Sequence, residues 1–185
     1  MKRLFLIAAL LVAGAAGAQA AAPSKQEVLQ AIEVMEKNVG GPAATEAAKT
    51  IVIYAQVSDD VMVDIGPDQL PWIEEKWPLA KEEARSRQSL LMAAFVAGNI
   101  KSQIKNDKAE DDTYSGWIFA IETYRRLQSR GPFVSPAIEA LSKLQQQGKL
   151  LQHAREVHAN QDQNDSSDSA PRPLARLRPS NRSRA

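Results

Sequence analysis

Four glutamates in the middle of the chain could act as a general acid and a general base. They are Glu74, Glu75, Glu82 and Glu83. Most glycoside hydrolases place two carboxyl groups on either side of the bond that they cleave. Charged residues at the exposed start of a helix are more often solvated, and no spacing singles out two of these four. The sequence therefore keeps a hydrolase of cell-wall glycan or peptide, acting through acidic residues of segment 58–83, as an alternative function.

Two tryptophans of the same segment could contact a partner. Trp72 and Trp77 lie between prolines, and tryptophan supplies a large, rigid contact area. Apolar neighbours on both sides predict that Trp72 is buried and structural, whereas a neighbouring lysine and proline predict that Trp77 is the more exposed ring. We hypothesise a binding surface formed by Trp77 and Trp72 together with Glu74 and Glu75.

Nucleophilic and metal chemistry have less support. The chain contains no cysteine and only two histidines, His153 and His158. Their spacing of five residues differs from the i, i+4 pair of H-E-x-x-H zinc sites, and zinc needs ligands that converge on one point. Glu156 between them makes a metal site conceivable, but we predict two solvated histidines. We expect no catalytic residue, metal or cofactor.

A short acidic segment separates two strongly apolar stretches of the chain. Its carboxylates belong to Asp107, Glu110, Asp111 and Asp112. Clustered carboxylates can hold Ca²⁺, but this segment lacks the glycine and the ligand alternation of an EF-hand loop. An aspartate directly before a helix can instead accept hydrogen bonds from the first backbone N–H groups of that helix. We predict that Asp111 or Asp112 caps the helix that follows.

Apolar residues at helical spacing predict an all-α domain of five or six helices. The strongest pattern lies on either side of the acidic segment, in residues 90–105 and 114–127. Two amphipathic helices joined by a short linker bury their apolar faces most simply as an antiparallel hairpin. Gly98 and Gly116 would allow close approach where the two helices cross.

The remaining helices are expected on both sides of this hairpin. Their predicted ranges are 25–38, with a capping box of Ser24 and Glu27, then 43–57, then 78–105, which includes the first hairpin helix, and finally a helix after Pro136 that Gly148 divides or weakens. Prolines forbid a long helix in residues 58–77. That segment is either a strap packed across the helices or a functional loop.

The N-terminus has the pattern of a bacterial secretory signal peptide. Lys2 and Arg3 precede an apolar run at residues 4–14, and Ala18-Gln19-Ala20 is a small-x-small cleavage site. The apolar run is shorter than the roughly 20 residues that a membrane span needs. We expect cleavage after Ala20 and a mature protein, periplasmic or secreted, that does not span the membrane. Without cysteine the mature protein has neither a lipidated cysteine nor disulfides.

The sequence divides into a signal peptide (1–20), the all-α domain (21–159) and a tail (160–185) that is rich first in serine and aspartate and then in proline and arginine. This composition predicts a disordered tail. Its arginines could contact anionic envelope surfaces weakly. Removing Lys2 and Arg3 changes the formal net charge from +1 to −1. A near-neutral balance gives no reason to expect nucleic-acid binding.

These observations favour an exported accessory protein of the cell envelope. In this interpretation a helical surface and the tryptophan-containing loop bind a partner protein whose identity the sequence does not reveal. Besides the hydrolase, a second alternative is a structural or stress-related protein without a fixed ligand. No feature of the sequence excludes it.

Overall fold

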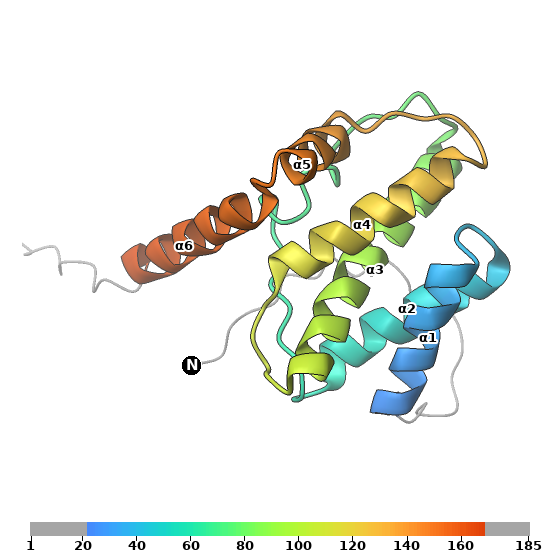
Figure 1. Ribbon diagram of the computed structural model, residues 1–185. Helices are drawn as coiled ribbons and strands as arrows, with labels where there is room; N and C mark the ends of the chain where they lie inside the picture. Colours follow the sequence, from blue (N-terminus) through green and yellow to red (C-terminus); the bar gives the residue numbers. More distant parts are fainter. Residues whose placement is uncertain (1–21, 169–185) are drawn as a thin grey trace, which may run out of the picture.

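A computed structural model describes residues 22–168, with side chains for residues 22–160. This part of the chain contains no strand and six helices, which confirms the predicted all-α fold (Figure 1). The helices are α1 (Lys25–Lys37), α2 (Pro42–Val57), α3 (Lys81–Asn106), α4 (Thr113–Gln128), α5 (Pro136–Gln146) and α6 (Leu150–Asp168). The predicted signal peptide lies outside the described residues.

Local sequence signals determine where most helices begin. Glu27 N–H donates to Ser24 Oγ, and Ser24 N–H donates in return to Glu27 Oε2 at 2.7 Å, so the predicted capping box is confirmed. Asp112 caps α4 by accepting a hydrogen bond from Ser115 N–H at 3.0 Å. Helix α3 begins three residues later than predicted, at Lys81, because residues 78–80 belong to the preceding loop.

Helices α3 and α4 pack against each other more extensively than any other pair of described helices and run antiparallel, as Figure 1 shows. Gly98 of α3 and Gly116 of α4 lie at their crossing. A β-carbon on Gly98 would come within 2.3 Å of Ser115 O, and one on Gly116 within 2.6 Å of Phe95 Cδ2. Real β-carbons do not approach so closely. The predicted hairpin and its glycine crossing are therefore confirmed.

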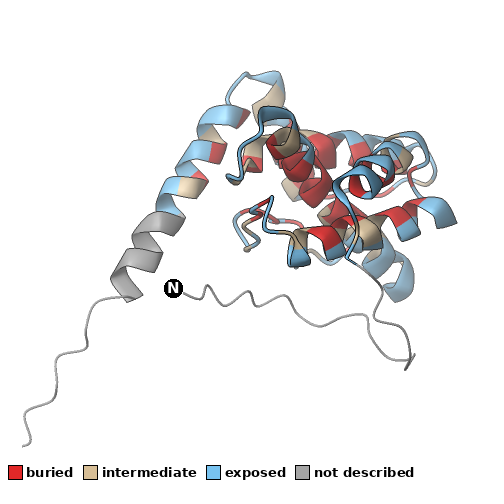
Figure 2. Cartoon of the chain, turned by 90° about the horizontal axis from the view of Figure 1, so that it is seen from below, coloured by how far each residue is buried: buried red, intermediate tan, exposed pale blue. Residues whose placement is uncertain are grey.

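Residues 58–80 form a strap across these helices, one of the two alternatives that the sequence left open. Figure 2 shows the buried residues concentrated within the helical body. The strap contributes Val61, Val63, Leu70, Trp72 and Trp77 to this core. Polar side chains of α3 and α4 hold its backbone. Gln103 pairs with both the N–H and the C=O of Met62, and Trp117 Nε1 donates to Gln69 O at 2.8 Å.

Helix α6 is separated from α5 by Gly148, whose positive φ of +68° ends the helical run. The apolar side chains of Leu150, Ala154 and Val157 bury the first half of α6 against the body. The helix then leads away from the other helices (Figure 1). Its backbone continues to Asp168, inside the segment that the sequence predicted to be disordered from residue 160. Residues 169–185 of that predicted tail lie outside the described residues.

We predict that Gly98→Ala destabilises the fold by about 1–3 kcal/mol, although alanine is normally the better helix former by about 1 kcal/mol. The steric conflict outweighs helix propensity because the nearest obstacle, Ser115 O, belongs to the backbone and cannot rotate away. Gly116→Ala should act in the same direction. Chemical denaturation would measure both effects.

Gly41→Ser is the matched control, because a β-carbon there meets nothing nearer than 3.8 Å and serine is a good N-cap for α2. Equal unfolding midpoints for Gly98→Ala and the control would contradict the close helix crossing.

Candidate functional site

The two strap tryptophans are both buried. Trp72 is fully enclosed, so its predicted burial is confirmed. Trp77 is only 7% exposed, so the prediction that it is an exposed ring is wrong. Its ring centroid lies 5.0 Å from that of Phe133, and its Nε1 donates to Glu75 Oε2 at 2.8 Å. The segment between α4 and α5 covers Trp77, a long-range contact that its lysine and proline neighbours do not indicate.

Glu75 holds the start of α5 rather than facing a ligand. Besides Trp77, its carboxylate accepts hydrogen bonds from Ser135 Oγ and, at 2.7 Å, from the backbone N–H of Ala137. A carboxylate at a helix N-terminus satisfies free N–H groups and favours the positive end of the helix dipole. Gln88 of α3 donates to the backbone carbonyl of Glu75 at 3.0 Å and so fixes this part of the strap.

The other three candidate glutamates are exposed, and two of them pair with arginines of their own helix. Glu74 is exposed, Glu82 pairs with Arg85 at 3.2 Å, and Glu83 pairs with Arg87 at 2.6 Å. Two hollows of the described surface lie elsewhere, around Gln103 and the α3–α4 loop. None of the four glutamates lines either hollow, and their observed contacts give no support to the paired carboxylates that glycoside cleavage needs.

The acidic segment between α3 and α4 takes part in a buried polar network. Asp111 Oδ1 accepts hydrogen bonds from Asn99 Nδ2 at 2.6 Å and from Asp64 N–H at 2.9 Å. Its Oδ2 accepts from Thr113 Oγ1 at 2.7 Å and Thr113 N–H at 3.1 Å. Asn99 is fully buried, and its Oδ1 accepts a hydrogen bond from Gln103. Asp111 therefore joins the strap to both hairpin helices.

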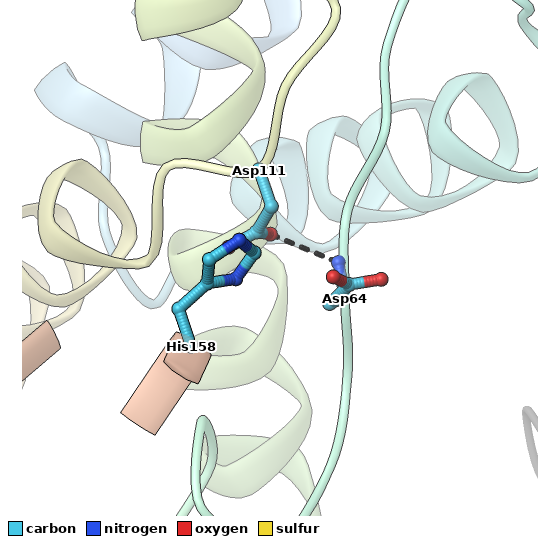
Figure 3. Close-up of side chains that lie close together, drawn as sticks. All are labelled: Asp64, Asp111 and His158. Atoms are coloured by element: carbon cyan, nitrogen blue, oxygen red, sulfur yellow. Dashed lines mark hydrogen bonds between the residues drawn. The ribbon is translucent and has the colours of Figure 1, made fainter. Parts of the chain in front are cut away.

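A cluster that could hold a metal ion forms around Asp111. Asp64, Asp111 and His158 each place one potential ligand atom within 4.8 Å of those of the other two, and all three are half-buried (Figure 3). We call these residues the Asp–Asp–His cluster. They come from the strap, the α3–α4 loop and α6.

The two histidines have different surroundings, which the sequence did not predict. His153 stacks on Trp117 of α4, with ring centroids 5.2 Å apart. His158 lies one and a half turns further along α6, in the cluster. Neither is the freely solvated histidine that the five-residue spacing suggested. Asp64 was not a sequence candidate at all, and its only signal is a charge inside the apolar run of residues 61–65.

Solvent-facing apolar side chains remain on α2. Ile53 is 44% and Val57 53% exposed, and they lie one turn apart on the side away from the buried stripe of Ala44, Ala47, Ile51 and Tyr54.

None of the described helices is long and apolar enough to cross a membrane. Comparison with protein-family models, with curated proteins and with solved structures finds no match.

We predict that Glu75→Ala lowers the free energy of unfolding by about 1–3 kcal/mol, because it leaves the N–H groups of Trp77 and Ala137 without their partner. Glu74→Ala is the matched control. Glu74 is exposed, so its removal should change the stability by no more than about 0.5 kcal/mol. Thermal and urea melts of both variants would measure the difference. Equal stability would show that Glu75 does not hold α5.

Tyr124 also contacts the start of α5 and should make the stability of the fold depend on pH. Burial raises the pKa of Tyr124 to about 12. The hydrogen bond from Ser135 N–H opposes this shift, and the Glu139 carboxylate, which accepts a hydrogen bond from the phenol O–H at 2.8 Å, adds to it. The folded state therefore retains the proton after the unfolded chain has lost it.

The stability that this proton contributes should be complete below pH 10 and should fall as the pH rises towards 12, by up to about 2–3 kcal/mol. Denaturation of Tyr124→Phe and the unmodified protein between about pH 9 and 12 would measure it, since the loss should be present in the unmodified protein and absent from Tyr124→Phe. Tyr114→Phe is the control, because Tyr114 is less buried. Parallel stability curves for all three proteins would contradict the assignment.

Proposed function

We propose that this chain is an exported accessory protein of the cell envelope that binds a partner protein through a helical surface. Export rests on the basic, apolar and small-residue pattern of residues 1–20. A binding role without catalysis is supported by the use of the candidate carboxylates, because Glu75 and Asp111 hold strap, loop and helix ends together.

The outer face of α2 carries the proposed contact, in place of the tryptophan loop. Ile53 and Val57 expose large apolar surface on successive turns of one helix. Single exposed apolar residues are ordinary on any protein. Two on adjacent turns share one face of the helix, so both can enter the same apolar groove of a partner as anchors four residues apart. The buried stripe of α2 packs the other side of this helix against the core.

Site-specific photocrosslinking in producing cells would test this proposal. A photoreactive amino acid placed at residue 53 or 57 of the full chain should give one adduct of defined size, because both positions face the partner. The same probe at Thr45, an exposed residue on another side of α2, should give none. Equal labelling from all three positions would contradict a specific contact at this face.

A double substitution, Ile53→Asp with Val57→Asp, separates binding from folding. Both side chains are exposed, so thermal stability should change little, while the adduct formed by a probe at Thr50 beside them should weaken.

Cell fractionation and N-terminal sequencing test export independently. We expect the mature chain outside the cytoplasm, beginning at Ala21. A cytoplasmic chain that retains residues 1–20 would contradict the envelope location.

A further inference from the structure

The Asp–Asp–His cluster unites three segments that are far apart in the sequence. Asp64 belongs to the strap, Asp111 to the α3–α4 loop and His158 to α6. Figure 3 shows the three side chains converging. Their potential ligand atoms all lie within 4.8 Å of one another. Around a zinc ion with ligands at 2.0–2.1 Å, tetrahedral ligand atoms are about 3.3 Å apart, so a small inward movement of the side chains would suffice.

The surrounding residues hold Asp111 in place for such a role. Thr113 Oγ1 and Asn99 Nδ2 both donate to its carboxylate, and Asn99 is fully buried. In metal centres, ligating carboxylates are commonly oriented by further hydrogen bonds of this kind. The Asp64 N–H group that donates to Asp111 brings the Asp64 carboxylate to the same place. On α6, burial of Ala154 and Val157 directs His158 towards both aspartates.

The donor set indicates which ion would bind. One imidazole nitrogen with two carboxylate oxygens suits a first-row divalent cation such as Zn²⁺, whereas Ca²⁺ and Mg²⁺ prefer sites of oxygen alone. The chain has no cysteine, so no thiolate can take the ion elsewhere. Three protein ligands also leave one position of a tetrahedral ion for water or for a partner's side chain.

We propose that Asp64, Asp111 and His158 bind one Zn²⁺ ion, which fastens α6 to the strap and to the α3–α4 loop. The ion offsets the repulsion between two carboxylates held close together and joins the three segments that carry its ligands. This site is independent of the proposed contact on α2.

Calorimetric titration of the untagged, chelator-treated full chain with Zn²⁺ would test the site. We expect one ion per chain, much weaker binding of Mg²⁺ and Ca²⁺, and visible absorption typical of nitrogen and oxygen ligands when Co²⁺ replaces Zn²⁺. His158→Gln should reduce the affinity at least about 100-fold, because it removes a ligand, and Thr113→Val about 10-fold or more, because it releases Asp111.

His153→Gln is the matched control, since His153 stacks on Trp117 and lies outside the cluster. It should leave the affinity for Zn²⁺ unchanged. Asp111→Asn disturbs four hydrogen bonds and could prevent folding, so Asp64→Asn serves as the carboxylate variant, checked for native circular dichroism. The proposal would be overturned if folded Asp64→Asn bound Zn²⁺ with unchanged affinity. It would also be overturned if both histidine variants lost affinity equally, because the ion would then be bound by surface imidazoles alone.

Proteolysis gives a readout that separates fastening of α6 from binding alone. Arg155 is exposed on α6 next to the buried Ala154. Trypsin should cleave after Arg155 several-fold more slowly when Zn²⁺ is present, and His158→Gln should remove this protection. Cleavage at the same rate with and without Zn²⁺ would show that the ion does not fasten α6.

Discussion

The close approach of α3 and α4 at Gly98 and Gly116 is the constraint on which the remaining structure depends. At this crossing each helix lies directly against backbone and side-chain atoms of the other, so no further side chain fits between them. The rest of the core must therefore form around the outer faces of the hairpin. The strap and helices α1 and α2 cover part of that surface, and α5 and α6 cover another part. A larger separation would place every one of these contacts at the wrong distance.

Three acidic residues organise chain segments that have no regular structure of their own. Asp111, Asp112 and Glu75 each accept several hydrogen bonds from backbone or hydroxyl donors. The strap belongs to neither a helix nor a sheet, so its backbone N–H groups must find other hydrogen-bond acceptors. This need explains why carboxylates gather at the helix starts and along the strap, a distribution that in the sequence resembles a catalytic arrangement.

The helical fold could be predicted because its signals are local or periodic. The Ser24–Glu27 capping box, the Asp112 cap and the apolar stripes of the hairpin all lie within a few residues of the feature that they determine. Gly98 and Gly116 could be paired because each is the single glycine of its helix and a hairpin brings the two helices into contact. The predicted start of α3 was three residues too early, because Pro78 is compatible with a loop as well as with a first helical turn.

The candidate site could not be predicted in the same way. Burial of Trp77 depends on Phe133, and the position of His158 beside Asp64 depends on how α6 docks. Neither contact leaves a pattern in the neighbouring sequence. The role of Glu75 was missed because a carboxylate that caps a helix from a distant segment has no fixed spacing from that helix.

Gly148 decides which of two helical arrangements the C-terminal part of the chain adopts. Residues from Pro136 onward have enough helix formers for one continuous rod, and a β-carbon at position 148 would meet nothing within 4 Å. Only the left-handed backbone conformation, which costs other residues about 1–2 kcal/mol, requires glycine there. A straight rod would carry His158 in a different direction from Asp64 and uncover Trp117. Gly148 thus sets the direction in which α6 leaves α5, and with it the position of α6 against the strap and α4.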